Sequence, residues 1–187
     1  GSLSNPVTTN GLTWTATFTP TSNIEDSTNL ISILGGAVND AAGNANVAGK
    51  AAANYAIDTK APTVSSVTLS DSKLSVGETS GVTVVFSEAV SGLTSSDFVV
   101  DSGSISAVTS TNGVTWTATY TPAANTEDST NTVGVVASAV TDAAGNANES
   151  SANSSNYTVD TKAPTVNNLI LSDAALKSGE TSSVTVV

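Results

Sequence analysis

The sequence predicts an all-β chain built from tandem sandwich repeats. First, Thr, Ser, Val, Ala and Asn dominate the composition, a mixture that favours strands joined by polar turns. Second, short runs that alternate apolar and polar residues are separated by turn residues. Third, whole motifs recur at a fixed spacing: DTKAPTV at 58–64 returns at 160–166, and DAAGNAN at 40–46 returns at 142–148, each 102 residues later.

The constant spacing sets the expected domain boundaries. Because every repeated motif has the same offset with no insertion, the chain divides into three parts. These are the C-terminal part of one repeat (1–60), a complete repeat (61–162) and the N-terminal part of a third repeat (163–187).

Within the complete repeat, the alternating runs predict about seven strands, the number typical of an immunoglobulin-like sandwich. In the run 82–86 every second residue is apolar and points inward, and in the run 114–120 the inward residues are Trp116, Ala118 and Tyr120; the equivalent Trp14 is expected to be a core residue too. Asn112–Gly113 predicts a tight hairpin between two of the strands. The predicted strands are 64–69, 82–86, 98–100, 104–109, 114–120, 132–137 and 157–159.

The composition also excludes several classes of function. The chain has no His and no Cys, which removes the usual nucleophile–base pairs and zinc sites. Composition alone leaves a carboxylate-only enzyme possible. Because acid pairs such as Glu127–Asp128 recur every 102 residues, which argues against a unique active site, we expect no enzyme. A net charge of −11 with only five Lys and Arg residues argues against binding to nucleic acid or anionic membranes. No apolar stretch is long enough to be inserted in a bilayer. An acidic surface instead suits hard cations such as Ca²⁺.

The acidic residues recur at the same repeat positions and should gather at the ends of the sandwich. Tracing the strands puts one set of acids at the end where the chain leaves a repeat, and another at the end where it enters. In a linear array these ends face each other, so Asp58 in the linker should approach Glu88, Asp97, Asp142 and Asn146 of the next repeat. The candidate Ca²⁺ ligands are Asp40, Asn44, Asp58, Asp71, Glu78, Glu88, Asp97, Asp128, Asp142, Asn146 and Asp160. The alternative is that these acids are solvated loop tips that promote solubility.

The two partial repeats predict partners. Neither 1–60 nor 163–187 can cover its apolar face alone, so we expect both to pair with neighbouring repeats, with strands of neighbouring chains, or with further sequence.

Taken together, the motifs resemble a known family. The run LSDSKLSVGETSGVTVVFSEAVSGLTSSDF (69–98), followed by NGVTWTATYTP, VTDAAGNAN and NYTVDTKAPTV, resembles bacterial Ig-like repeats, similar to the extender regions of RTX-type and biofilm-associated adhesins. The resemblance implies a secreted, cell-surface location and a stalk that projects a distal binding domain. It also implies calcium at the domain junctions, at Asp58, Asp142, Asn146 and Asp160.

Two other functions remain open at this point. The repeats could themselves bind a host glycan or protein, which would call for an exposed aromatic patch outside the core pattern. They could also be accessory domains of a secreted carbohydrate-active enzyme, which the rest of a longer chain would reveal.

Overall fold

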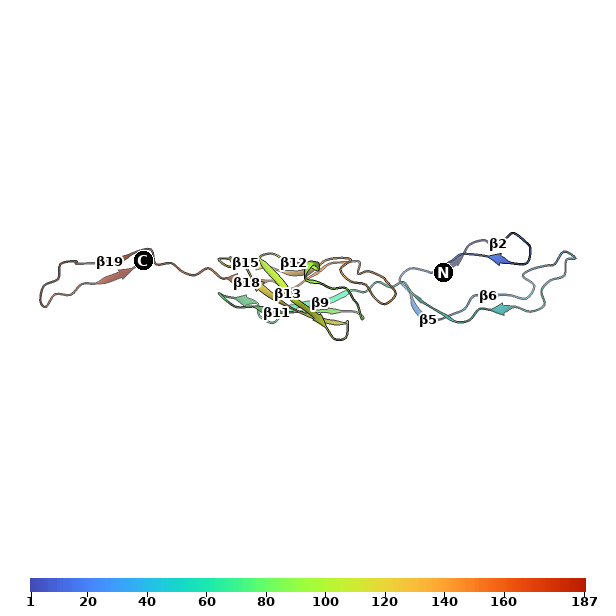
Figure 1. The fold of residues 1–187 in the computed structure, drawn as a ribbon, viewed down its shortest axis with the longest axis horizontal. Helices are drawn as coiled ribbons and strands as arrows, with labels where there is room; N and C mark the ends of the chain where they lie inside the picture. Colours follow the sequence, from blue (N-terminus) through green and yellow to red (C-terminus); the bar gives the residue numbers. More distant parts are fainter.

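The complete repeat is a β-sandwich at the centre of an elongated molecule, and all but one of its strand pairs are antiparallel. The structure, a computed structural model, describes all residues 1–187, and the three parts of the chain follow one another roughly along one line (Figure 1). One layer is a four-stranded sheet in the order β13-β14-β11-β9. Its strands are β9 (Val64–Leu69), β11 (Ser80–Phe86), β13 (Gly103–Ser110) and β14 (Thr115–Pro122).

The opposite layer consists of two three-stranded sheets, β10-β18-β15 and β12-β16-β17. A single turn of 3₁₀ helix, η1 (Ser95–Asp97), precedes β12. The strands of this layer are β10 (Lys73–Leu74), β12 (Phe98–Val100), β15 (Glu127–Asn131), β16 (Val133–Val135), β17 (Ala152–Asn153) and β18 (Tyr157–Asp160).

The core lies between these two layers and follows the predicted alternation. On β11, Val82 and Val84 are 1% exposed, whereas Thr83 between them lies on the other side of the strand and is only half-buried. Tyr120 of β14 packs edge-to-face on Tyr157 of β18, with ring centroids 5.2 Å apart. The prediction of an all-β, immunoglobulin-like sandwich is therefore confirmed.

Of the predicted strand 132–137 only Val133–Val135 is a strand, so its predicted bounds are wrong at both ends. The chain forms β15 and β16 here, in two different sheets, and they are separated at Thr132. The break occurs because the backbone N–H of Thr132 donates to the Asp101 carboxylate at 2.8 Å instead of to a ladder. Just before it, the N–H of Asn131 donates to the side chain of Asn156 at 2.9 Å. The repeat thus has ten strands, two of which, β10 and β17, are only two residues long.

The predicted hairpin at Asn112–Gly113 forms, with a longer turn than two residues. Ser110 pairs with Trp116 across β13 and β14, and the side-chain oxygen of Asn112 accepts the N–H groups of Val114 and Thr115. Gly113 has a φ of 72°, which a residue with a Cβ adopts only at a cost. The indole of Trp116 donates to the carbonyl oxygen of Gly113 and its ring packs against the core, as predicted.

The two partial repeats form only two-stranded pairs and have no core. All 23 buried residues of the chain lie between Pro62 and Thr161. Trp14, expected to be a core residue, is 56% exposed because residues 1–60 contain no counterpart of β11 to cover it. The strands of residues 1–60 are β1 (Ser2–Leu3), β2 (Val7–Thr8), β3 (Trp14–Thr15), β4 (Phe18–Thr19), β5 (Glu25–Asn29), β6 (Ser32–Ile33), β7 (Lys50–Ala51) and β8 (Tyr55–Asp58), and those of 163–187 are β19 (Leu169–Leu171) and β20 (Val184–Val186). No helix in the structure has the length and apolar character that a membrane span requires.

Candidate metal centre

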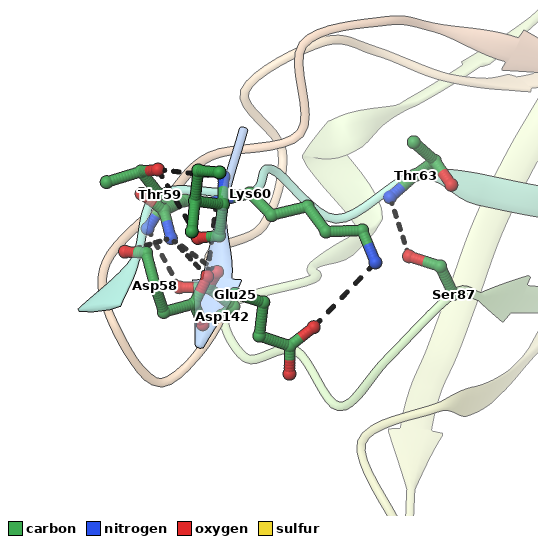
Figure 2. A network of polar contacts seen from close by, with 9 residues as sticks. Glu25, Asp58, Thr59, Lys60, Thr63, Ser87 and Asp142 are labelled. Atoms are coloured by element: carbon green, nitrogen blue, oxygen red, sulfur yellow. Dashed lines mark hydrogen bonds and ion pairs between the residues drawn. The ribbon is translucent and has the colours of Figure 1, made fainter. Parts of the chain in front are cut away.

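The linker between the first and second repeats is short and held at both ends. β8 ends at Asp58 and β9 begins at Val64, so five residues join the two repeats. At the start of the linker, the N–H of Thr59 donates to the carbonyl oxygen of Ile24 at 2.8 Å. At its end, Thr63 and Ser87 exchange two hydrogen bonds, of 2.9 Å between backbones and 3.0 Å to the Ser87 hydroxyl (Figure 2).

Three carboxylates converge where this linker meets the complete repeat. Asp58 at the end of β8, Glu88 after β11 and Asp142 in the loop 136–151 each offer one carboxylate oxygen, and these oxygens lie within 4.8 Å of one another. Figure 2 shows Asp58 and Asp142 side by side although they come from different repeats. No other three carboxylates in the chain converge in this way. The structure thus brings Asp58 to the acids of the following repeat.

Asn146 bridges two of these acids. Its side-chain N–H donates to Asp142 at 2.8 Å, and to the side-chain oxygen and backbone carbonyl of Asp58 at 3.4 and 3.3 Å. The backbone N–H of Asn146 donates to the other oxygen of Asp142 at 2.8 Å. Asn146 therefore acts in this structure as a donor that joins the two repeats and partly offsets the repulsion between the carboxylates.

The loop that carries Asp142 has a conformation that does not depend on contact with a neighbouring repeat. Its counterpart in the first repeat has no preceding repeat beside it, yet Asn44 donates to Asp40 through the same two groups, at 2.8 Å from the backbone and 3.0 Å from the side chain. The Asp–Asn turn is thus a property of the DAAGNAN sequence itself, in which Gly43 and Gly145 supply the positive φ.

A buried asparagine fixes the base of this loop. Asn148 is fully buried; its oxygen accepts the N–H of Val140, and its amide donates to the carbonyl oxygens of Val136 and Ser150. Asn46 makes the equivalent bonds in the first repeat. These bonds satisfy backbone groups that the loop leaves without a ladder partner.

A second link ties the loop of Glu88 to the loop of Asp142. Ser91 and Thr141 exchange backbone hydrogen bonds of 2.8 and 3.1 Å. Glu88 and Asp142 therefore belong to one connected unit of the complete repeat, and the preceding repeat supplies Asp58.

The pKa values of the acids reflect their mutual approach. Burial raises the pKa of Glu88 above its ordinary 4.5, and the charges of Asp142 and Asp58 raise it further, while Lys60 acts in the opposite direction. Burial also opposes ionisation of Asp142, but the hydrogen bonds from Asn146 and the neighbouring loop outweigh it and lower the pKa of that carboxyl. The nearest cation, Lys60, forms its ion pair with Glu25 at 3.7 Å rather than with the cluster (Figure 2).

This donor set fits a hard divalent cation. Carboxylate oxygens are the ligands that Ca²⁺ prefers, and three of them converge here without an ion pair to neutralise them. Ca²⁺ takes six to eight oxygen ligands, so carbonyl oxygens and water would complete the shell.

The other predicted ligands lie outside the cluster. Asp97 instead caps η1, because its carboxylate accepts the N–H and hydroxyl of Thr94 at 2.8 and 2.7 Å. Asp160 repeats the position of Asp58, but residues 163–187 contain no counterparts of Glu88 and Asp142. Asp40 and Asn44 form the same turn as their counterparts in the complete repeat, without a linker acid beside it. The remaining three accept local hydrogen bonds from backbone N–H groups: Asp71 from Lys73, Glu78 from Ser75 and Asp128 from Thr130. Asp128 lies in the strand β15 and not in a loop.

Sequence reasoning assigned no role to Thr59, Thr63, Ser87 and Asn148, which position the linker and the loop. A signal was available for Thr59, Thr63 and Asn148, since all three belong to motifs that recur. Thr161, the counterpart of Thr59, is buried and makes the same anchoring bonds, donating from its hydroxyl to the carbonyl oxygen of Ala123 and from its backbone to Thr126 at 2.7 Å each.

Two packed β-layers around one core and a recurring junction loop define an immunoglobulin-like sandwich of the tandem-repeat class. The chain belongs to the bacterial Ig-like domain family, which matches residues 1–57 and 58–159. The family resemblance read from the sequence is thereby confirmed, whereas its link to RTX-type adhesins stays a prediction. Comparison with curated proteins and with solved structures found no match.

Proposed function

We propose that this chain is a segment of an extender stalk of a secreted bacterial surface protein, and that Ca²⁺ at the repeat junctions stiffens it. Membership of the bacterial Ig-like domain family supports the class of protein. The observation that carries the proposal is the meeting of Asp58 with Glu88 and Asp142 at a five-residue linker. In such a stalk the repeats space and orient a binding domain carried elsewhere on a longer protein.

The junction geometry supports a role in stiffness. The linker is fixed to the first repeat through Thr59 and to the second through Thr63, so few of its torsions are free. Pro62 between them is buried and has a fixed φ. The main remaining freedom is bending between the two repeats. The carboxylate cluster has members on both repeats, so a cation bound to it would restrict this bending.

Calcium acts in this proposal through linkage. We call the junction closed when Asp58 lies beside Glu88 and Asp142, and open when the two repeats have moved apart. A cation that binds the closed junction better than the open one stabilises the closed form and straightens the rod. Because Asp58 comes from one repeat and Glu88 and Asp142 from the next, only the closed junction presents all three carboxylates. Extracellular calcium modules bind at roughly 10⁻⁴–10⁻³ M, so the response is expected at about millimolar calcium. The cluster is given no catalytic role, since the DAAGNAN loop and the linker acid recur with each repeat.

The test is small-angle scattering of an array of several intact repeats, in EDTA and then in millimolar calcium, with magnesium as a comparison. We expect calcium to raise the maximum dimension and the melting temperature, and magnesium to do neither. Equal dimensions and melting temperatures in EDTA and in calcium would contradict the calcium assignment and leave a spacer governed by the linker and by packing.

A variant of the same array shows whether the response belongs to the cluster. Asp142→Asn in every repeat should abolish the calcium response, because it removes one ligand charge while the Asn146 backbone bond retains an acceptor. The matched control is Glu149→Gln, because Glu149 is an exposed acid in the same loop, its side chain makes no hydrogen bond, and its counterpart is Val47. The control should respond to calcium as the unchanged array does.

A further inference from the structure

The chain enters and leaves the complete repeat at opposite ends. Figure 1 shows residues 1–57 and 163–187 on opposite sides of this repeat, whose strands run roughly along the long axis of the molecule. The first linker leads into β9 at Val64, and β18 leads out of the repeat at Asp160. Tension along the chain therefore pulls β9 and β18 in opposite directions, nearly parallel to the strands.

The first two strands of the repeat belong to different layers. β9 pairs with β11 in the four-stranded sheet, and β10 pairs with β18 in the opposite layer. Each of the two strands also places a side chain in the core: Val67 of β9 is 6% exposed and Leu74 of β10 is 2% exposed. Residues 64–74, which we call the anchor segment, are thus fixed to both layers.

β10 and β18 run in the same direction, which decides how tension acts on them. Lys73 lies beside Thr158 and Leu74 beside Val159, and the N–H of Thr158 donates to the carbonyl oxygen of Ser72 at 2.9 Å. Tension reaches β10 from its start and β18 from its end, so these parallel strands must slide past each other. The hydrogen bonds between them then carry the load together, whereas a pull on both strands from the same end breaks the bonds one after another.

β9 is loaded in the same sliding direction. Its ladder with β11 extends over Val64–Leu69, and the hydrogen bonds of an antiparallel ladder are perpendicular to the strands. A pull along β9 therefore loads these bonds together as well. The anchor segment cannot leave the repeat without breaking both sets of bonds and exposing Val67 and Leu74.

We propose that the complete repeat is a load-bearing unit and that the anchor segment, held on β11 and β18, is the part that resists tension. The inference rests on the proposed stalk, because a stalk carries tension between its attached end and its bound end. Forced unfolding is governed by the rate of unfolding and not by the free energy of unfolding. The bonds of the anchor segment should therefore determine the unfolding force, and bonds elsewhere in the repeat should affect stability alone.

The test pulls the 187-residue chain from two pairs of points by single-molecule force spectroscopy. Because the chain has no Cys, two engineered cysteines are its only attachment points. Lys60→Cys with Lys162→Cys transmits the force through the linkers and makes β10 slide along β18. Ser72 and Ser155 are exposed and line one shallow groove beside the starts of these two strands. Ser72→Cys with Ser155→Cys therefore pulls the same pair apart from one end.

The two directions should differ strongly in force. Pulling through the linkers should release on the order of 300 Å of chain in one step as the complete repeat unfolds. The force of that step should be several times the force that first separates β10 from β18 in the second direction. Equal forces in the two directions, or a lower force through the linkers, would overturn the proposal.

A pair of proline variants separates mechanical resistance from stability. Thr158→Pro removes the N–H that donates to Ser72, and Val136→Pro removes an N–H that donates to the carbonyl oxygen of Asp97 at 3.0 Å, outside the loaded strands. Both variants should melt at a lower temperature, but only Thr158→Pro should lower the unfolding force through the linkers. An equal loss of force in both variants contradicts the assignment to the anchor segment. If Thr158→Pro does not fold, the comparison of directions decides.

All of these measurements are made in EDTA. An absent calcium response in scattering therefore leaves them unaffected, and equal forces in the two directions leave the calcium response as it is. Failure of the load-bearing proposal can thus be told apart from failure of the proposed calcium-stiffened stalk.

Discussion

The side-chain amide of Asn146 lies 3.4 Å from the carboxylate of Asp58, although 88 residues separate them in the sequence. This contact crosses the boundary between two repeats. It shows that the junction is built from loop residues of one repeat and the last strand residue of the preceding one, so its properties can be changed without altering either core.

Replacement of Glu88 should have opposite effects with and without calcium. The folded chain raises the pKa of Glu88, so this group favours folding at low pH and the contribution is lost as pH rises through the raised pKa. In EDTA, Glu88→Gln should therefore melt at a higher temperature than the unchanged chain at about pH 7 and at a similar temperature near pH 4. In calcium, the same variant should show a weaker rise in melting temperature because a ligand is lost. Thermal unfolding by circular dichroism at both pH values measures this.

Asp142 should show the reverse dependence on pH. Its pKa is lowered from the ordinary 3.8, so its contribution to stability is present above that value and is lost as pH falls through the lowered pKa. In EDTA at about pH 7, Asp142→Asn should be less stable than the unchanged chain, and the difference should shrink below pH 4. If the variant is as stable as the unchanged chain at both pH values, the hydrogen bonds from Asn146 to Asp142 contribute nothing to folding.

Asn148→Ala should weaken both the fold and the junction. The substitution leaves the N–H of Val140 and the carbonyl oxygen of Val136 without their buried partner, at a cost of about 1–3 kcal/mol. Because Asn148 fixes the loop of Asp142, the calcium affinity measured by titration calorimetry should fall as well.

The matched control for Asn148 is Asn131→Ala. Asn131 is 1% exposed and donates to the carbonyl oxygens of Asp128 and Tyr157 at the opposite end of the repeat. It should lower stability by a similar amount and leave calcium affinity unchanged. An equal loss of affinity in both variants would indicate general destabilisation and no specific role for Asn148.

Thr59→Val should loosen the junction without disturbing either repeat. The Thr59 hydroxyl donates to the carbonyl oxygen of Thr21 at 2.8 Å and accepts the N–H of Ile24 at 3.0 Å. Valine has nearly the same shape and lacks both bonds, each worth about 1 kcal/mol. The maximum dimension in scattering should decrease while the melting temperature of the complete repeat stays close to that of the unchanged chain. Ala53→Ser, a substitution at an exposed position before β8, should change neither quantity.

The core strands could be predicted because their sequence carries a period of two. The bounds of β9 and β12 agree with the prediction, and β11, β13 and β14 differ by one or two residues at their ends. β15 could not be found this way. Its sequence, EDSTN, is polar throughout, and its place in the sheet depends on pairing with β18, which is more than 25 residues away. β10 and β17 are too short to show any period.

The candidate site was predictable to the extent that topology alone determines it. Tracing the strands was enough to bring Asp58 near Glu88, Asp142 and Asn146, because a loop must lie at the end of the strand that precedes it. Asp97 was placed with them on the same argument, but its carboxylate is taken by the N-terminus of η1. The local sequence Thr94–Asp97 has the spacing of a capping box, which is the signal that could have excluded it.

The junction is assembled from the last strand residue of one repeat, Asp58, and loop residues of the next, and the complete repeat carries both kinds of residue, with Asp160 at the position of Asp58. Removing or adding a whole unit of 102 residues therefore regenerates an unchanged junction at the point of the edit. In the proposed stalk, this allows the length to change in uniform steps during evolution, with no new interface to optimise.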